Sequence, residues 1–219
     1  MRRQMKIYLM RHGETDYNKA GLIQGTLDIP LNDNGLELAR LTQAGFKQEG
    51  LTFDLCYCSP LIRAKQSAEI LLEGTNTPVI FDKRICEMNF AEGEGVLLKD
   101  ISVKPELSNI DALFHNPNAY CATEHGESYE ALFARVEDFL EHEIYPKEDS
   151  HKQILICCHG GIIRAFLAFM KKLDLSQFWN NHQPNCSVNI IEIKNHSLHI
   201  LEEHKLYYTL SEEKKGSIL

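Results

Sequence analysis

KIYLMRHGET, residues 6–15, joins a short apolar run to a turn of charged and polar side chains. The run at residues 6–10 has the length of a buried strand and is too short for an ordinary helix. Arg11, His12 and Gly13 follow it at once, where the chain leaves the strand. Ligands of α/β proteins bind beyond the carboxyl ends of the strands. We therefore expect functional side chains at this strand end.

Apolar runs and helical patterns alternate along the rest of the chain. Strands are predicted at residues 53–58, 78–81 and 154–158, with a final hairpin at 188–193 and 198–201. Helices are predicted at residues 35–48, 61–72, 128–144 and about 161–170. Strands that alternate with helices form a mostly parallel sheet covered on both faces. The predicted fold is therefore α/β, with three α/β/α layers.

The segment at residues 89–125 breaks this alternation. It holds several Gly, Pro and Asn residues, and only short helices are expected, near 96–101 and 108–114. We expect an insertion that lies over the site-bearing end of the sheet. No repeat or linker divides the chain, so residues 1–219 are predicted to form a single domain. The polar tail at residues 211–219 is expected to be mobile.

Composition excludes several kinds of partner. The formal charge of −8 over 219 residues argues against a nucleic-acid partner, which requires a basic surface. The first apolar run is too short for a signal peptide, and no run approaches the roughly 20 apolar residues that span a membrane. Cys157 and Cys158 are neighbours on a predicted strand, which suits buried thiols. We expect a cytoplasmic protein without a membrane partner, either a monomer or a homodimer.

Further motifs follow the first one in a fixed order. They are DYN at 16–18 with QG at 24–25, SPLIRA at 59–64, EMNF at 87–90 with EG at 94–95, GES at 126–128 and HGG at 159–161. Together with RHGET at 11–15 they resemble the histidine phosphatase (phosphoglycerate mutase-like) superfamily, in its small phosphatase branch. The resemblance covers most of the chain, from Tyr8 to Ser187. It implies a phosphoric monoester hydrolase.

The resemblance also implies a division of roles in the site. Neutral His12 would attack phosphorus through one ring nitrogen while the other donates to a backbone carbonyl. Arg11 and Arg63 would bind the phosphoryl oxygens, because a guanidinium keeps its charge and presents a planar fork of donors. His159 would stabilise the transferring group, and Glu87 would protonate the leaving alcohol and then activate water. The arginines and histidines neutralise the charge of the phosphate monoester dianion, so neither a metal nor another cofactor is expected.

The acid has two rivals in the sequence. Glu92 and Glu94 follow Glu87 closely, and Ala91 and Gly93 stand where the family has a glycine and a tryptophan. The spacing of the segment favours Glu87 as the acid and gives Glu94 a structural role.

Two amides and a glycine complete the expected binding set. Asn18 and Gln24 suit phosphate binding, and they equally suit the stabilisation of their own loop. Gly160 is expected at the phosphate because it follows His159 directly. Glu127 precedes a predicted helix, where a carboxylate favours the N-terminus. The sequence contains no recognised metal-ligand spacing and no Gly-rich nucleotide loop.

Three functions fit these residues. The first is hydrolysis of a small phosphorylated metabolite, the second a 2,3-bisphosphoglycerate-dependent phosphoglycerate mutase, and the third a non-catalytic protein that binds phospho-ligands. Mutases of this kind carry further arginines in the insertion, whereas residues 89–125 hold only Lys99 and Lys104 as cations. A pure binder needs no nucleophile, so hydrolysis is the prediction. Several side chains of the insertion either contact an organic substrate or, as we favour, pack the insertion onto the sheet: Phe90, Phe114, His115, Tyr120 and His125.

Overall fold

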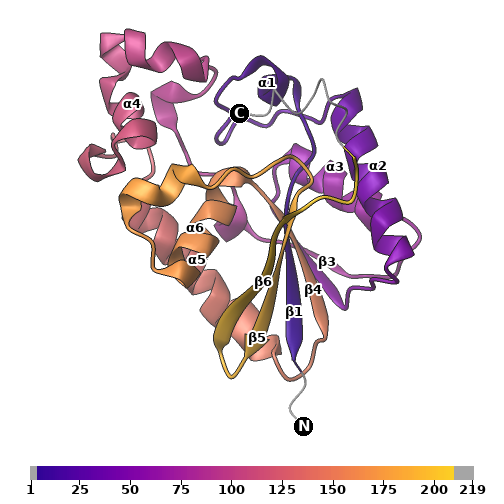
Figure 1. Ribbon diagram of the computed structural model, residues 1–219. Coiled ribbons are helices and arrows are strands. Elements are labelled where there is room, and N and C mark those ends of the chain that lie inside the picture. The colour runs from indigo at the N-terminus through magenta and orange to yellow at the C-terminus, as the bar shows by residue number, and fades with distance from the viewer. Residues whose placement is uncertain (1–3, 210–219) are drawn as a thin grey trace.

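The computed structural model describes residues 4–209, so the tail at 211–219 lies outside the described residues. A six-stranded sheet in the order β3-β2-β4-β1-β5-β6 forms its centre (Figure 1). The strands are β1 (Met5–Arg11), β2 (Leu55–Cys58), β3 (Val79–Phe81), β4 (Gln153–Cys158), β5 (Val188–Lys194) and β6 (Ser197–Lys205). Strand β1 pairs in parallel with β4, and β2 pairs in parallel with both β4 and β3. Only β5 runs antiparallel to β1, and β6 returns beside it as the predicted hairpin.

Helices cover both faces of this sheet, as predicted. They are α1 (Asp16–Ala20), α2 (Asp33–Gln48), α3 (Ile62–Leu71), α4 (Ser108–His115), α5 (Tyr129–Phe139) and α6 (Gly160–Lys171). Figure 1 shows α2 and α3 on one face and α5 and α6 on the other, which gives three layers. The parallel strands all point upward in this view, so their carboxyl ends meet at one edge.

The alternation of side chains along the strands explains the two helical layers. On β1, Ile7 and Leu9 face the layer of α5 and α6, whereas Tyr8 and Met10 face α2 and α3. On β4, Cys158 and Cys157 divide between the two faces in the same way, and both are buried free thiols, as expected. Each large apolar side chain buried in this way contributes about 1.5–3 kcal/mol relative to exposure. Both faces of the sheet therefore stabilise the fold.

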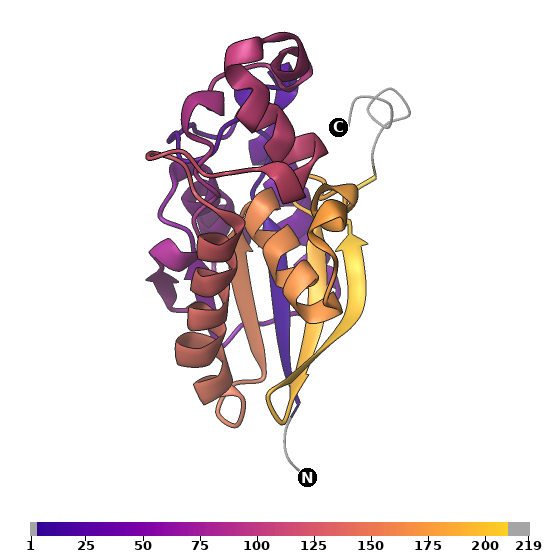
Figure 2. The ribbon, with the colours of Figure 1, turned by 90° about the vertical axis from the view of Figure 1, so that its left-hand side faces the viewer.

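The insertion at residues 89–125 lies over the carboxyl ends of the strands (Figure 2). It contains α4 and four short 3₁₀ turns: Ala91–Gly93, Leu98–Val103, Pro105–Leu107 and Pro117–Ala119. The aromatic rings of Phe90 and Phe114 lie 5.5 Å apart and pack with Trp179 against the core. Tyr120 also packs there, while His115 pairs with Asp111 on the surface. The three aromatic side chains thus pack the insertion onto the sheet layers, as favoured from the sequence, whereas His115 and His125 are exposed and do not.

Three features differ from the expected elements. A short helix, α1, forms directly after the first strand, where Thr15 and Asn18 make a reciprocal capping box that was not predicted. The expected helix at 128–144 ends as a regular α-helix at Phe139 and continues as a π-helical turn over Leu140–Ile144. The edge strand β3 is exposed along its whole length. Among residues 4–209, no helix has both the length and the apolar character needed to cross a membrane.

Candidate active site

The predicted site residues come together at the carboxyl ends of β1, β2 and β4. Arg11 ends β1 and His12 follows it, while His159 follows β4 in the same position. Arg63 lies in the first turn of α3, directly after β2. The rings of His12 and His159 have centroids 5.1 Å apart. His12 is 2% exposed and Arg63 and His159 are fully buried, so the sheet topology builds one interior cluster from distant parts of the chain.

His12 is held in one tautomer by its neighbour. Its Nδ1 lies 2.6 Å from the carbonyl oxygen of Gly13, which only accepts, so Nδ1 carries the proton. The unprotonated Nε2 accepts the Nε–H of Arg63 across 3.3 Å. Burial, followed by the charges of Arg63 and Arg11, holds the pKa of His12 well below its usual 6.5. The ring is therefore neutral at pH 7, with a lone pair on Nε2.

Arg63 is oriented by the backbone of the loop before α2. Its Nη1 and Nη2 each donate to a carbonyl at 2.7 Å, that of Leu27 and that of Gly25 respectively. Gly25 adopts a φ of 53°, a left-handed conformation that favours glycine. Burial lowers the pKa of Arg63 to about 10, which still leaves the guanidinium charged at pH 7. The loop thus fixes the plane of this guanidinium beside His12.

Two buried nitrogens of the cluster have no hydrogen-bond partner within residues 4–209. They are Nε of Arg11 and Nδ1 of His159. The other groups of these side chains are engaged: Nη1 of Arg11 donates to the carbonyl of Gln183, and Nε2 of His159 lies 2.7 Å from the hydroxyl of Ser59. When Ser59 donates to Nε2, Nδ1 carries the proton. A buried donor without a partner costs about 1–3 kcal/mol. A bound oxyanion would accept hydrogen bonds from both of these nitrogens.

Glu87 lies at the N-terminus of α6, beside the arginines. Its Oε2 accepts the N–H of Gly161 at 3.0 Å, and its Oε1 accepts the N–H of Met88 at 2.9 Å. A Cβ on Gly161 would lie 2.4 Å from Oε1, so a side chain there would displace the carboxylate. Its charge acts on the pKa values of both Arg11 and Arg63. The structure thus brings Glu87 to the cluster.

The two rival carboxylates lie elsewhere. Oε1 of Glu94 accepts the N–H groups of Thr26 at 2.7 Å and of Phe90 at 3.2 Å, so this side chain joins two loops. Glu92 is exposed and lies 3.2 Å from the hydroxyl of Thr123. Neither contacts the buried cluster, and the contacts of Glu94 are those of a structural residue.

Asn18 and Gln24 surround the hydroxyl of Thr15. That hydroxyl lies 3.0 Å from Oδ1 of Asn18 and 2.9 Å from Oε1 of Gln24. Asn185 approaches from the other side and donates to the carbonyl of His12 at 3.1 Å. Both amide oxygens therefore stabilise the loop. The NH₂ groups of Asn18 and Gln24 make no hydrogen bond within residues 4–209, so the ligand role stays a prediction.

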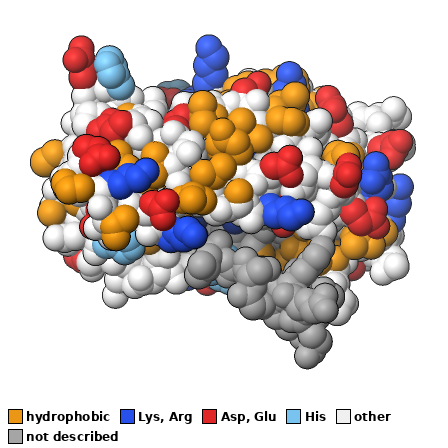
Figure 3. Space-filling view, turned by 90° about the horizontal axis from the view of Figure 1, so that it is seen from above, with side chains coloured by type: hydrophobic (Ala, Val, Ile, Leu, Met, Phe, Trp, Pro, Cys, Tyr) orange, Lys and Arg blue, Asp and Glu red, His pale blue; other side chains and the backbone are white. Residues whose placement is uncertain are grey.

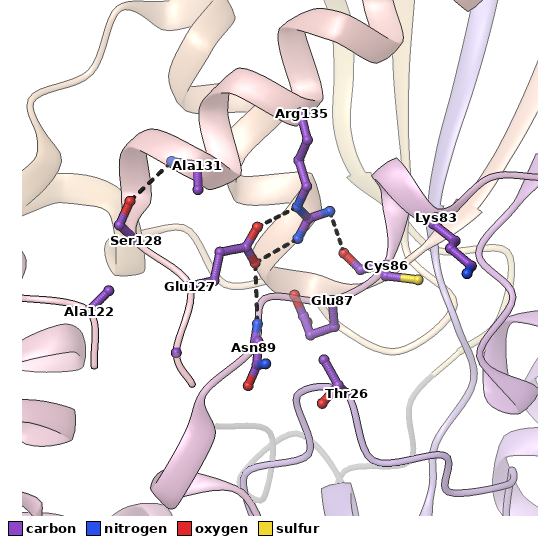
Figure 4. A pocket seen from close by; sticks show the side chains of 11 residues that line it. Thr26, Lys83, Cys86, Glu87, Asn89, Ala122, Glu127, Ser128, Ala131 and Arg135 are labelled. Carbon is purple, nitrogen blue, oxygen red and sulfur yellow. Dashed lines mark hydrogen bonds and ion pairs between the residues drawn. The ribbon is translucent and has the colours of Figure 1, made fainter. Parts of the chain in front are cut away.

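A cavity of about 510 Å³ opens beside Glu87 (Figure 4). Its lining includes Thr26, Lys83, Asn89 and Ser128 from three different parts of the chain. Glu87 is among its lining residues and His12 is not.

An ion pair that the sequence did not predict supports the wall of this cavity. Nε and Nη2 of Arg135 lie 2.6 Å and 3.0 Å from the two carboxylate oxygens of Glu127 (Figure 4). Nη1 of Arg135 donates to the carbonyl of Cys86 at 2.7 Å, and Glu127 accepts the N–H of Asn89 at 3.2 Å. Both bonds fix the segment that carries Glu87. Ser128, rather than Glu127, caps α5.

Arg164 is a third arginine near the cluster that sequence reasoning missed. It lies on α6 four residues after Gly160, and this helical spacing places both on one face. The four-residue spacing was a signal in the sequence, but the HGG motif that carried the prediction ends at Gly161. His182 and Gln183, from the loop before β5, also reach the cluster without belonging to a motif.

The described residues at this end of the sheet place no concentrated charge of one sign on the outer surface. Figure 3 shows hydrophobic side chains interspersed with single acidic and basic ones over the coloured part of this face. The cations of the site are therefore internal. Within residues 4–209, no group of three or more His, Cys, Asp or Glu side chains is arranged to hold a metal ion.

The chain is similar to known proteins over most of its length. A family model described as the histidine phosphatase superfamily (branch 1) matches residues 7–204. Phosphoserine phosphatase 1 of Hydrogenobacter thermophilus is 30% identical, with 87% of each chain covered. A 2,3-bisphosphoglycerate-dependent phosphoglycerate mutase of Buchnera aphidicola is 31% identical over 78% of this chain and 86% of its own length. The solved alpha-ribazole phosphatase of Shigella flexneri superposes with a TM-score of 0.80 at 25% identity, covering 92% of this chain and 96% of its own.

Proposed function

The chain belongs to the histidine phosphatase superfamily and hydrolyses phosphate monoesters; on this premise, we propose that it acts on a small phosphorylated metabolite through a phosphohistidine at His12. The observation that carries the proposal is the fixed tautomer of His12. A neutral ring whose Nδ1–H is held by the Gly13 carbonyl presents the Nε2 lone pair as a nucleophile.

In the first step, Nε2 of His12 attacks phosphorus and the bond to the ester oxygen breaks. Negative charge spreads over the three equatorial oxygens as the phosphoryl group moves from the ester oxygen to Nε2 of His12. Arg63 and Arg11 are the guanidinium donors for these oxygens, and Nδ1 of His159 adds a third donor. No metal is needed in this scheme, because these groups balance the charge of the dianion.

The proton that the leaving alkoxide requires comes from Glu87. In the second step, the same carboxylate takes a proton from water, whose oxygen attacks the phosphohistidine and releases orthophosphate. Free His12 is restored with its Nδ1–H still on Gly13. Glu87 suits both steps because it lies beside Arg11 and Arg63 and also borders the cavity.

The mutase remains the alternative with support from a relative. A mutase must grip a second anionic group within the site before it returns the phosphoryl group. Lys99 and Lys104, the cations of the insertion, are both exposed, so neither supplies that grip. The insertion itself thus offers no such grip, and the phosphatases among the relatives favour hydrolysis. A non-catalytic binder is disfavoured because the nucleophile, the acid and both arginines are present together.

Two measurements test the proposal. Phosphate release is followed from p-nitrophenyl phosphate and from 3-phosphoglycerate, with and without 2,3-bisphosphoglycerate. His12→Ala should abolish release, and wild-type enzyme quenched during turnover should carry an acid-labile, base-stable phosphoryl group. Equal release by wild type and His12→Ala would refute the nucleophile. Bisphosphate-stimulated isomerisation faster than hydrolysis would establish the mutase.

A further inference from the structure

Arg164 makes no ion pair in the part of the chain that the structure describes, and Glu87 is the nearby carboxylate whose charge acts on it. It is partly buried, its Nε is buried without a hydrogen bond, and residues 4–209 offer it no ion pair. Buried guanidinium groups are ordinarily paired, because removing a charge from water is costly. A charged side chain left in this state points to a ligand that is anionic.

The guanidinium of Arg164 lies next to that of Arg11. Side chains of a helix lean toward its N-terminus, and Arg164 leans toward Gly160. A Cβ on Gly160 would lie 3.0 Å from Nη1 of Arg164 and 3.6 Å from Nε of Arg11. Burial, followed by the charge of Arg11, lowers the pKa of Arg164 to about 10. Two like charges at this separation favour the entry of anions.

The surroundings of Arg164 define a small pocket wall. Its guanidinium lies over the ring of Trp179, 5.1 Å from the centroid. The indole N–H is fixed by the carbonyl of Leu113 and the hydroxyl of Tyr129, both at 2.7 Å. His182 stands nearby, and its Nε2 is buried without a partner. An aromatic face, one cation and one imidazole thus lie beside the phosphate-binding arginines.

We propose that Arg164, assisted by His182, binds a carboxylate on the alcohol part of the substrate. The substrate class is then a phosphate monoester of a small hydroxy or amino acid. This inference rests on the proposed function, because it assumes that Arg11 and Arg63 hold the phosphoryl group. The second cation that binds the substrate then lies on α6 and not in the insertion.

Charge balance favours a carboxylate over a second phosphate. Burial, with the nearby charges of Arg11 and Arg164, lowers the pKa of His182 to about 4, so its ring is neutral at pH 7. The subsite then offers a single positive charge, which matches a carboxylate monoanion. A phosphate dianion would leave one negative charge uncompensated beside an aromatic wall.

Lys83 is the competing cation. It is exposed and lines the cavity that Glu87 also borders, so a carboxylate placed in that cavity would meet it first. An exposed lysine is strongly hydrated and contributes less to recognition than a partly buried guanidinium. Lys83→Met is accordingly the matched control for Arg164→Met.

The test compares O-phosphoserine with O-phosphoethanolamine, which differ only by the carboxylate. The wild type should prefer O-phosphoserine in kcat/KM by about 10- to 100-fold, as expected for a charged hydrogen-bonded pair. Arg164→Met should remove most of this preference while changing p-nitrophenyl phosphate hydrolysis less than about threefold. Arg164→Lys should restore part of the preference, and Lys83→Met should leave it intact.

Binding without turnover gives a second readout. Trp179 is the single tryptophan of the chain, so its fluorescence reports directly on the Arg164 guanidinium above it. In His12→Ala protein, O-phosphoserine should change this emission saturably and O-phosphoethanolamine should not. Adding Arg164→Met to that variant should abolish the change.

Several outcomes would overturn the inference. They are an absent preference in the wild type, a preference that survives Arg164→Met or disappears in Lys83→Met, and an equal loss on all substrates in Arg164→Met. A stronger Arg164-dependent preference for fructose 1,6-bisphosphate over fructose 6-phosphate would assign the subsite to phosphate instead. Activity that is insensitive to His12→Ala would refute the proposed function, which is a separate result.

Discussion

Nε of Arg63 donates to Nε2 of His12 across 3.3 Å, so the arginine contacts the very nitrogen that we propose as the nucleophile. The other two nitrogens of this guanidinium are held by the carbonyls of Gly25 and Leu27, and it cannot turn away. A phosphoryl oxygen that enters must take over the Nε–H, which frees the lone pair of His12 at that moment. Burial, together with the charges of Arg63 and Arg11, keeps the ring neutral in the free enzyme, and in the proposed mechanism the contact yields to the phosphoryl oxygen.

Arg63→Lys should lower kcat/KM for p-nitrophenyl phosphate by about 10²- to 10³-fold, the usual effect of losing one oxyanion donor. A lysine lacks the fork that meets two carbonyls and the phosphoryl group at once. The protein should also melt at a lower temperature, because two buried carbonyls lose their donors. Arg40 is exposed and pairs only with exposed Glu37, so Arg40→Lys is the control and should change neither quantity.

Stability should fall as pH is lowered from about 7 to about 5. Burial and neighbouring charges hold the pKa values of His12 and His159 well below 6.5, so the unfolded chain binds protons here that the folded chain does not. Carboxyl groups whose pKa is lowered in the folded protein, such as those of Asp54 and Asp82, change the stability only below their ordinary pKa of 3.8. Thermal unfolding over this pH range should show a falling midpoint, and His159→Asn should make the slope shallower. A midpoint independent of pH would contradict the neutral state of the two rings.

Glu87→Gln should slow substrates with poor alcohol leaving groups by about 10²- to 10⁴-fold, the usual contribution of a general acid. p-Nitrophenyl phosphate should be affected less, because its leaving group needs little protonation. Steady-state rates for both substrate types measure the difference. Glu94→Gln is the matched control and should reduce stability without a leaving-group effect, since Glu94 joins Thr26 to Phe90. An equal loss on both substrate types in Glu87→Gln would transfer the acid role to Glu92 or Glu94.

Arg135→Lys should reproduce part of the Glu87→Gln defect although Arg135 touches no reacting atom. The arginine fixes the Cys86 carbonyl and Glu127, and a lysine cannot make these bonds together. We expect a kcat lower by about tenfold with a small change in KM. The double variant Arg135→Lys with Glu87→Gln should lose little more than Glu87→Gln alone, because both act through one carboxylate. Additive losses would show that Arg135 acts independently.

The residues of the site could be predicted from the sequence where a local motif follows the end of a predicted parallel strand. The strand ends before His12 and His159 are marked by apolar runs, and parallel pairing places them at one edge. Helix starts were also readable, since Asn32 caps α2 by accepting the N–H of Gly35 at 2.8 Å. These signals are short-range, and they fixed the fold class and the cluster of predicted residues.

The remaining features depend on contacts between segments far apart in the chain. The pairing of Arg135 with the Cys86 carbonyl joins α5 to the segment after β3, and no spacing in the sequence encodes it. No motif contains Arg164, and its position over the ring of Trp179 depends on the packing of α6 against a later segment. The exposure of β3 follows from its position at the edge of the sheet, which an apolar run does not reveal.

The strand order has a consequence for how the molecule opens. Strand β1 is hydrogen-bonded on both sides, by β4 and β5, whereas Glu87 lies on a segment of short turns between β3 and the insertion. Amide hydrogens of β1 and β4 should exchange only through global unfolding, and those of residues 82–95 through local openings. The proposed nucleophile, directly after β1, is then expected to exchange more slowly than the segment of the proposed acid. The rate at which the leaving group departs can then vary between relatives, while the residues at the ends of β1 and β4 that surround the phosphoryl group stay rigid.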